Sequence, residues 1–384
     1  MSFNLPHWDA QHSGDGHAIF EMVDRIAEGP VRDHAVEMDR TSEFPHVLYR
    51  QLGEAGLLAP RLPEEVGGIG LATYDYCRII IRLAQESGAV ANAVVGTGIA
   101  ANYLYVYGKG RFNDVIRAYA DGTLLPAMAL TEPGSGSDLR SLRTAAIPVE
   151  GGYRISGEKM WITLGGVCER VMVLARLPGE AADGLIGVLI DCDSEGFSRG
   201  KIEDLMGMRG LATSPLFFDD VFVPEDRVVG VAGKGFEQTS QALAFGRILV
   251  ASMAVGLARG ALRRVVDYTQ ERKQFGKRIW DFQNTKLKVG EYAARVLAVE
   301  SLLARACQAY DAGVDPVLEA SAAKYLASDL AMETGIFAVQ AHGGIGFSRQ
   351  LDVERFMRDA KITQIYEGTN EIQRLIIARN SITA

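Results

Sequence analysis

A glutamate close to the end of the chain, Glu367, has the surroundings of a base that could remove a proton from carbon. It stands in the segment IYEGTNEIQR, residues 365–374, with apolar residues before it and a glycine after it. Burial disfavours the ionised carboxylate and raises its pKa, which suits proton abstraction near neutral pH. The same carboxylate could instead cap the helix predicted to follow. The local sequence leaves both interpretations open.

The segment LTEPGSGSD, residues 130–138, is a candidate binding loop for an anion or a polar ring edge. Its glycines permit close approach of the backbone, and Thr131, Ser135 and Ser137 offer hydroxyl groups. Backbone N–H groups in such a turn can bind an anion. The simpler alternative is a β-turn closed by local Ser and Asp hydrogen bonds. The glycine spacing is not that of a dinucleotide-binding βαβ unit.

The segment KMWIT, residues 159–163, places an aromatic ring beside a hydroxyl at the end of a predicted strand. Trp161 could stack on a flat heterocycle while the hydroxyl of Thr163 bonds to the edge of that ring. Tryptophan is highly buried on average, so a core residue is the alternative.

Two further segments combine cations or glycines with predicted helix ends. In QERKQFGK, residues 270–277, Arg272 could bind a phosphate through its planar guanidinium, or be a solvated cation at the end of a helix. In QAHGGIGF, residues 340–347, adjacent glycines allow a ligand close to the backbone. His342 is assigned no chemical role, because a hydrogen-bonded structural histidine is the more common case.

The elements that must position these segments follow the order helix, strand, helix. An early helix, expected to end before Pro30, is predicted from apolar residues on one face: Ile19, Met22, Val23 and Ile26. A second helix is predicted from Pro45, with Gly56 at its end. A tight hairpin turn is predicted at residues 150–153. A bundle helix is predicted from a seam with spacings of three and four: Val289, Tyr292, Val296, Val299, Leu303 and Ala306.

This layout predicts a helical domain over residues 1–125, a β domain over 126–233 and a helical bundle over 234–384. The chain has 384 residues, of which 48% are hydrophobic, enough for a substantial core. A net charge of −8 argues against nucleic acid and anionic membrane surfaces as partners.

We expect neither a targeting segment nor special cysteine chemistry. We expect no secretory signal and no membrane span, because the start lacks a basic and then apolar region and no apolar run reaches about 20 residues. The four cysteines lie far apart in sequence, without metal-ligand or CxxC spacing, so we expect ordinary reduced thiols and no metal site. A cytoplasmic location is the expectation.

Taken together, the five segments resemble the motifs of the acyl-CoA dehydrogenase family, in the family's order, from about residue 15 to the end. The resemblance implies a multi-domain α+β fold with an N-terminal helical domain, a middle β-barrel or sandwich domain and a C-terminal four-helix bundle. It also implies a homotetramer or homodimer and FAD as cofactor.

The resemblance implies roles for particular residues, and it makes Glu367 the catalytic base. Residues implied to contact FAD are Leu130, Thr131, Ser137, Trp161, Thr163, Arg272, Phe275, Gln340, Gly344, Thr369 and Glu371, with Arg272, Phe275, Gln340 and Gly344 reaching it from a neighbouring subunit. Residues implied to bind the substrate are Ser137, Arg247, Tyr366 and Gly368.

The implied reaction is the α,β-dehydrogenation of an acyl thioester. Glu367 takes the α-proton while the β-hydride passes to flavin N5. The charge that develops on the thioester oxygen would be stabilised by the backbone N–H of Glu367 and a ribityl hydroxyl of FAD. Electrons would then leave to an electron-transferring flavoprotein, in fatty acid metabolism.

Some positions depart from the family pattern. Gly246 stands before Arg247 where some members carry the base, so Glu367 has no competitor. Ala244 replaces a usual acidic residue, Met128 a common aromatic one, and Leu164 follows the WIT motif where Asn is common. The tail pocket is expected to involve Val95, Ile99, Tyr366 and Gly246.

Alternatives remain open on the sequence alone. The acyl group could be carried by CoA or by a carrier protein. The same fold could serve as an enoyl-thioester reductase, an oxidase or a monooxygenase, although a retained base argues against the last. A non-catalytic flavoprotein partner is less favoured, because base and flavin motifs are both intact.

Overall fold

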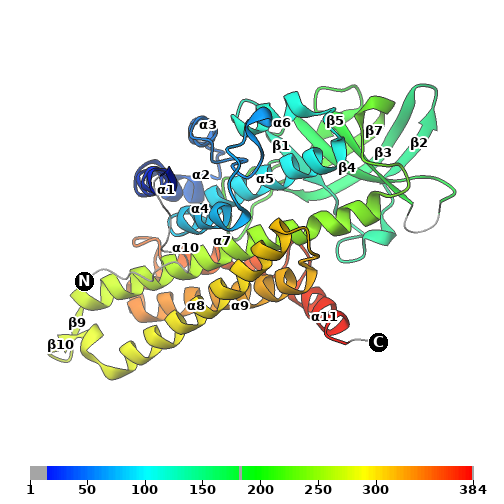
Figure 1. Cartoon of the computed structure of the whole chain (residues 1–384). Helices are drawn as coiled ribbons and strands as arrows, with labels where there is room; N and C mark the ends of the chain where they lie inside the picture. The colour runs from blue at the N-terminus through cyan, green and yellow to red at the C-terminus, as the bar shows by residue number, and fades with distance from the viewer. Residues whose placement is uncertain (1–14, 181–183, 383–384) are drawn as a thin grey trace.

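The computed structural model describes residues 15–180 and 184–382, and it has helices at both ends of the chain with a sheet between them (Figure 1). The N-terminal helices are α1 (Asp15–Ile26), α2 (Arg32–Thr41), α3 (His46–Glu54), α4 (Thr73–Ala84), α5 (Gly88–Gly108) and α6 (Asn113–Ala120). Residues 1–14, which fall within the expected helical domain and carry the expectation of no signal, lie outside the described residues.

The first helix, α1, ends at Ile26, before Pro30, as the sequence predicted. A π-helical turn, η1 (Ala27–Val31), joins α1 to α2 across a kink at Gly29, whose backbone has φ −99° and ψ −105°. Proline lacks an N–H group and disfavours a regular α-helix at its position, and the non-helical backbone of Gly29 breaks the helix just before it. At the end of α3, Gly56 adopts φ +71° as predicted.

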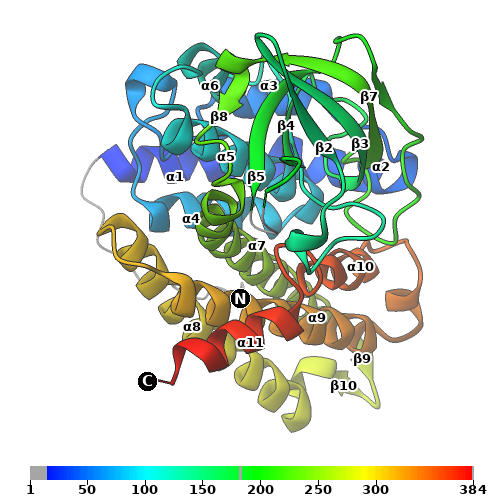
Figure 2. The ribbon, with the colours of Figure 1, turned by 90° about the vertical axis from the view of Figure 1, so that its right-hand side faces the viewer.

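The middle of the chain forms one eight-stranded sheet in the order β6-β7-β3-β2-β4-β5-β8, with β1 pairing in parallel with β4. Its strands are β1 (Pro126–Ala129), β2 (Ala145–Val149), β3 (Gly152–Ile162), β4 (Arg170–Arg176), β5 (Leu185–Asp191), β6 (Phe197–Arg199), β7 (Ser214–Pro224) and β8 (Val228–Val229). The predicted hairpin turn joins β2 to β3, which pair antiparallel. In Figure 2 these strands stand above α9, α10 and α11.

The C-terminal region is helical, and its long helices run side by side in Figure 1. They are α7 (Gly235–Glu271), α8 (Gln283–Asp311), α9 (Val317–His342), α10 (Glu354–Thr363) and α11 (Asn370–Asn380), with a small hairpin of β9 (Lys273–Gln274) and β10 (Lys277–Arg278) after α7. The predicted seam on α8 is confirmed, since Val289, Val296 and Leu303 are buried. Short 3-10 turns complete the fold: η2 (Glu64–Val66), η3 (Leu139–Ser141), η4 (Glu225–Arg227), η5 (Ile279–Asp281) and η6 (Gly343–Phe347).

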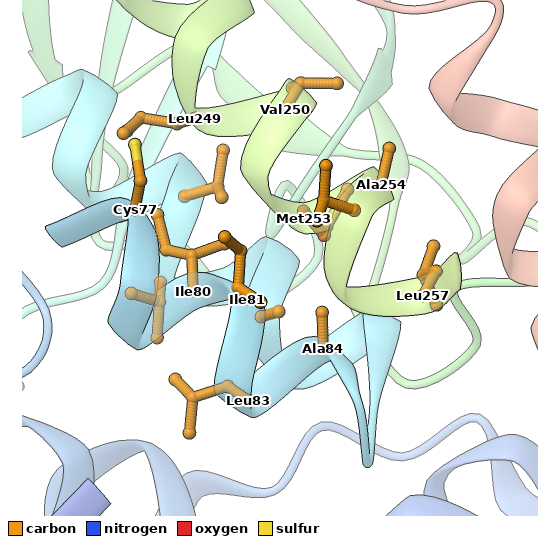
Figure 3. Close-up of a cluster of buried hydrophobic side chains, with 14 of the residues drawn as sticks. Cys77, Ile80, Ile81, Leu83, Ala84, Leu249, Val250, Met253, Ala254 and Leu257 are labelled. Atoms are coloured by element: carbon orange, nitrogen blue, oxygen red, sulfur yellow. The ribbon is translucent and has the colours of Figure 1, made fainter. Parts of the chain in front are cut away.

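The N-terminal helices and the bundle share one hydrophobic core. Figure 3 shows side chains of α4, among them Ile80 and Ile81, facing Met253 and Leu257 of α7. A side chain at Gly256 would overlap the carbonyl oxygen of Ile81, so glycine lets the two helices approach closely. The order helical, sheet, helical is confirmed, while the boundaries after residues 125 and 233 stay a prediction.

Two helices, α5 and α7, are long and apolar enough to cross a membrane by length and composition. Most of each is buried inside the fold, 78% of the apolar window in α5 and 83% in α7. Core helices pass the same test, and here the apolar faces are covered by neighbouring helices.

The four cysteines are free and buried, but the fold brings them together in two pairs. The Sγ atoms of Cys77 and Cys307 lie 3.7 Å apart, and those of Cys168 and Cys192 lie 3.6 Å apart. Separation along the sequence therefore did not predict their separation in space.

Candidate active site

Glu367 lies in the short turn that joins α10 to α11. Its backbone is left-handed, with φ +55°, and Gly368 follows at φ +88°. A left-handed glutamate is costly, on the order of 1–3 kcal/mol, and persists where the surroundings fix it. The cap of α11 is Thr369, whose Oγ1 accepts a hydrogen bond of 3.4 Å from the N–H of Ile372. Capping is therefore not the role of Glu367.

The carboxylate of Glu367 points into the protein. Its Oε2 atom is buried and has no hydrogen-bond partner among the described residues. Burial raises the pKa of this carboxyl, and the positive charges of Arg247 and Lys324 only partly oppose that rise. A buried carboxylate without a partner is costly to hold, which is the electrostatic condition of a carbon base.

Gly246 of α7 faces this carboxylate. A Cβ atom at position 246 would overlap Oε2 of Glu367 and would lie 3.4 Å from Cδ1 of Ile99. Gly246 and Ile99 thus lie beside the carboxylate of Glu367. A larger residue at position 246 would therefore displace the carboxylate of Glu367, while the expected part of Gly246 in the tail pocket stays a prediction.

Tyr366 ties the turn to α5. Its hydroxyl donates to Oδ1 of Asn92 over 3.2 Å, and burial raises its pKa well above the usual value. Arg247, one residue after Gly246, is buried, and its Nε has no hydrogen-bond partner among the described residues. Burial lowers the pKa of Arg247, and the negative charge of Glu367 opposes that change.

A buried ion pair that the sequence analysis missed joins the two β-domain segments. Nζ of Lys159 donates to the carbonyl of Leu130 over 2.9 Å and to Oε1 of Glu132 over 2.8 Å. The N–H of Met160 donates to the carbonyl of Thr131 over 2.9 Å. These hydrogen bonds hold the loop at residues 130–138 against the end of β3, which carries the segment KMWIT. The sequence signal for this ion pair was a lysine in one motif and a glutamate in the other.

Trp161 is not a core residue. It is 54% exposed, with a left-handed backbone at φ +60°, and it presents its ring on the surface of the β domain. Leu164, just after Thr163, is buried in the same hydrophobic cluster against which Tyr366 and Ile99 pack. The strand end that carries Trp161 and Thr163 is thus continuous with the core around the base.

The loop at residues 130–138 combines both interpretations offered by the sequence. Glu132 and Ser135 exchange backbone hydrogen bonds, and Oγ of Ser135 donates to the carbonyl of Asp138, as in a locally closed turn. Ser137 is exposed on that turn and Thr131 is half-buried. Ser135 serves the turn, and the other two hydroxyls lie where a ligand could reach them.

The remaining predicted cofactor residues divide into two groups. Thr369 and Glu371 lie beside the base turn, in a cleft of about 290 Å³ that Tyr325 and Arg374 also line. Arg272, Phe275, Gln340 and Gly344 are exposed. Phe275 stands at the tip of the β9–β10 hairpin, at the end of the bundle remote from the sheet (Figure 1). One copy of the chain thus places this hairpin away from the sheet whose strand β3 carries Trp161.

His342 has the structural role expected of it. Its Nδ1 lies 2.7 Å from the carbonyl of Ala338, and its ring stacks on Tyr268 with centroids 4.3 Å apart. Burial lowers its pKa.

Three family models match consecutive parts of the chain. They describe the acyl-CoA dehydrogenase N-terminal domain at residues 13–114, the middle domain at 127–221 and the C-terminal domain at 233–382. An acyl-CoA dehydrogenase of Bacillus subtilis is 38% identical, with the match covering 94% of this chain and 96% of that protein. The chain belongs to the acyl-CoA dehydrogenase family.

Other relatives in the acyl-CoA dehydrogenase family act on various acyl groups. A cyclohex-1-ene-1-carbonyl-CoA dehydrogenase of Syntrophus aciditrophicus is 35% identical over 94% of this chain and 88% of its own length. The CarC subunit of a caffeyl-CoA reductase–Etf complex of Acetobacterium woodii is 34% identical over 89% of this chain and 91% of its own length.

Several solved structures share this fold over nearly the whole chain. Butyryl-CoA dehydrogenase of Megasphaera elsdenii has a TM-score of 0.94 at 32% identity, covering 98% of this chain and 100% of that one. A structure from work on the electron transferring flavoprotein of Acidaminococcus fermentans has a TM-score of 0.94 at 33% identity, covering 98% and 100%. PigA with FAD and proline has a TM-score of 0.91 at 26% identity, covering 97% and 99%.

The residues present suit FAD, the cofactor of this acyl-CoA dehydrogenase fold. An exposed indole at Trp161, the glycine-rich loop fastened to it and the hydroxyl of Thr163 offer stacking and hydrogen bonds to a flavin ring. The buried Oε2 atom of Glu367, which has no partner among the described residues, is available to accept a proton. The reaction class is thus flavin-dependent dehydrogenation.

Proposed function

We propose that this chain oxidises an acyl-CoA thioester between its α and β carbons, with Glu367 as the base that removes the α-proton. The observation that carries the proposal is the buried Oε2 atom of Glu367, which has no partner among the described residues and belongs to a carboxyl with a raised pKa. Such a carboxylate gains more by taking a proton than one in water does. The glycine at position 246 provides the space in which it stands.

Two cations, Arg247 and Lys324, flank the carboxylate of Glu367 and influence its pKa. Arg247 and Lys324 oppose the rise in the pKa of Glu367 that burial causes. Bound FAD supplies the acceptor for the β-hydride. The chain contributes orientation and a dry, charged environment, which is where preorganised electrostatics acts most strongly.

The turn also offers a donor for the thioester oxygen. The backbone N–H of Glu367 donates to no described residue, whereas its carbonyl accepts from Nε2 of Gln373 over 3.0 Å. We propose that this N–H binds the substrate oxygen as negative charge builds there. Ser137, Arg247, Tyr366 and Gly368 are proposed as further substrate contacts; Nε of Arg247, left without a described partner, supports its inclusion.

Glu367→Gln tests the base directly. The amide keeps the size of the side chain but cannot accept the α-proton. We expect the variant to bind FAD and to lose nearly all exchange of the α-proton of an acyl-CoA with deuterated solvent. Exchange at the wild-type rate would show that another group is the base.

The substrate is identified by flavin bleaching. Reduction of the bound flavin by acyl-CoAs of graded length and branching would give the preferred acyl group, and the same acyl groups on a carrier protein would decide between the two carriers. A protein that binds no flavin would contradict the cofactor and the reaction together.

We further propose that a second copy of the chain completes the cofactor site, within a homotetramer or homodimer. Arg272, Phe275, Gln340 and Gly344 are exposed, and the β9–β10 hairpin that carries Phe275 lies at the end of the bundle remote from the sheet (Figure 1). Several large apolar side chains of the bundle surface are exposed as well: Phe275, Leu287, Ile336 and Phe347. Large apolar side chains that are exposed in one copy would be covered in such an assembly, which supports the proposal.

The electron acceptor is proposed to be an electron-transferring flavoprotein, because a relative belongs to a reductase–Etf complex. That relative is a caffeyl-CoA reductase, which makes the reverse reaction a second candidate. The forward direction would be tested by reducing the bound flavin with an acyl-CoA and then adding oxidised electron-transferring flavoprotein. We propose a cytoplasmic role in fatty acid metabolism.

A further inference from the structure

A lysine on α9, Lys324, is buried beneath the turn that carries the base. Its relative exposure is 0%, and its Nζ donates to the carbonyl of Gly368 over 2.8 Å and to Oδ1 of Asn370 over 3.0 Å. Lysine is rarely buried completely without a paired carboxylate, and both acceptors here are neutral. An ammonium group in such a place is stabilised only if the turn keeps its carbonyl oxygen directed at it.

Neighbouring residues of α9 extend this contact to both ends of the turn. Oγ of Ser328, one helical turn after Lys324, lies 2.9 Å from Nδ2 of Asn370 and accepts its hydrogen bond. Oδ1 of Asp329 accepts from the side chain of Asn370 over 2.8 Å and from the side chain of Gln364 over 2.6 Å. Gln364 precedes Glu367 and Asn370 follows it, so one face of α9 holds the turn on either side of the base.

The inner side of the turn is fixed as well. Nε2 of Gln373 donates to the carbonyls of Glu367 and Gly368, over 3.0 and 2.8 Å. The carbonyl of Gly368 therefore accepts from both Gln373 and Lys324. These contacts oppose the relaxation of the left-handed backbone at Glu367, which would move the carboxylate and the N–H group together.

We propose that Lys324 is a positioning residue for the base: it holds the carbonyl side of the turn so that the carboxylate and N–H of Glu367 face the substrate, and its charge favours the ionised base. This inference rests on the proposed role of Glu367. Lys324 touches neither substrate nor cofactor in this assignment and acts through the turn.

The charges around Lys324 support the second half of the proposal. Burial lowers the pKa of Lys324 to about 8, and Glu367, Asp329 and Glu371 oppose that change while Arg247 adds to it. These groups come from the turn, from α9 itself, from α11 and from α7. In return, Lys324 is the second cation, after Arg247, that lowers the pKa of Glu367.

Lys324→Met is the decisive variant, because methionine fills the space and removes both the donors and the charge. We expect the FAD content to be unchanged. The plateau rate of α-proton exchange should fall about tenfold, because the carboxylate of Glu367 would no longer be directed at the substrate. The acid limb of the exchange profile should also move to higher pH, because the carboxylate loses a stabilising cation.

Two companion variants separate charge from geometry. Ser328→Ala keeps the ammonium and removes the two hydrogen bonds between Ser328 and the side chain of Asn370, so exchange should fall by about threefold with no shift of the acid limb. Lys288→Met removes an exposed cation of α8 that pairs with Glu291, and its profile should match that of the wild type.

An unshifted profile in Lys324→Met, or a loss of exchange that only follows a loss of FAD, would overturn the proposal. Should Lys324→Met fail to fold, wild-type exchange in Ser328→Ala would overturn it. Exchange retained by Glu367→Gln would instead refute the base itself, so the two failures are distinguishable.

Discussion

The carboxylate of Glu367 occupies the space into which a side chain at Gly246 would extend, because a Cβ atom there would lie 3.1 Å from its Cδ and overlap its Oε2. The two residues are 121 positions apart and come from α7 and from the turn before α11. The absence of a side chain at one position is thus a condition for the base at the other.

Gly246→Ala should therefore impair the base while leaving the fold intact. The added methyl group pushes the carboxylate aside, and a displacement of about 1 Å can cost on the order of 100-fold in rate. We expect α-proton exchange to fall at least tenfold with FAD content unchanged. Gly290→Ala on α8, where a Cβ would meet nothing within 4 Å, is the matched control. Equal rates in both variants would show that the carboxylate has room to move.

The raised pKa of Glu367 also predicts how stability depends on pH. The folded chain binds this proton more tightly than the unfolded chain, whose glutamate has the ordinary value of 4.5. At pH values between 4.5 and the raised pKa of the folded chain, the folded state carries more protons than the unfolded state. The contribution of Glu367 to the free energy of unfolding therefore falls as the pH rises through this range.

Glu367→Gln removes that cost, because the amide is never charged. Its melting temperature should exceed that of the wild type at pH 7.5 by about 1–3 °C, and the difference should vanish near pH 4. Calorimetry at both pH values gives the comparison. A lower melting temperature at pH 7.5 would mean that Arg247 and Lys324 stabilise the carboxylate by more than its burial costs.

The sequence predicted the parts of the site that belong to contiguous segments. Glu367 next to a glycine, and Trp161 near a strand end, are local patterns, and both lie where such patterns placed them. The contact of Lys324 with Gly368 spans 44 residues and depends on how α9 packs, which no local pattern encodes. The end of the first helix before Pro30 is also a local pattern, and α1 ends at Ile26.

The buried pair of Lys159 and Glu132 makes a prediction about the cofactor loop. Glu132→Gln leaves the ammonium of Lys159 buried without a counter-charge, which costs about 3 kcal/mol when such a pair is broken. Lys159 has a pKa lowered to about 8, chiefly by burial, and Glu132 opposes that change.

In Glu132→Gln the pKa of Lys159 should fall further, so the folded chain holds fewer protons than the unfolded chain and stability rises with pH. The loss of unfolding free energy should thus be larger at pH 6 than at pH 9, as measured by chemical denaturation. FAD affinity should fall in parallel at pH 6, because the carbonyl of Leu130 loses its fixed position. Equal losses at both pH values would mean that the lysine is not charged in the fold.

The last prediction concerns Phe275, which is 93% exposed at the tip of its hairpin in a single copy. If a second copy buries this ring beside its cofactor, Phe275→Ser should weaken both assembly and FAD binding, the latter about tenfold. Val47→Ser on α3, where the valine is 69% exposed, removes an exposed apolar side chain elsewhere and serves as the control. Light-scattering mass and the ratio of flavin to protein absorbance report the two effects. If the mass and the flavin content of Phe275→Ser equal those of the wild type, Phe275 does not contact the cofactor of a second copy. The contact would then fall to the other proposed residues, Arg272, Gln340 and Gly344.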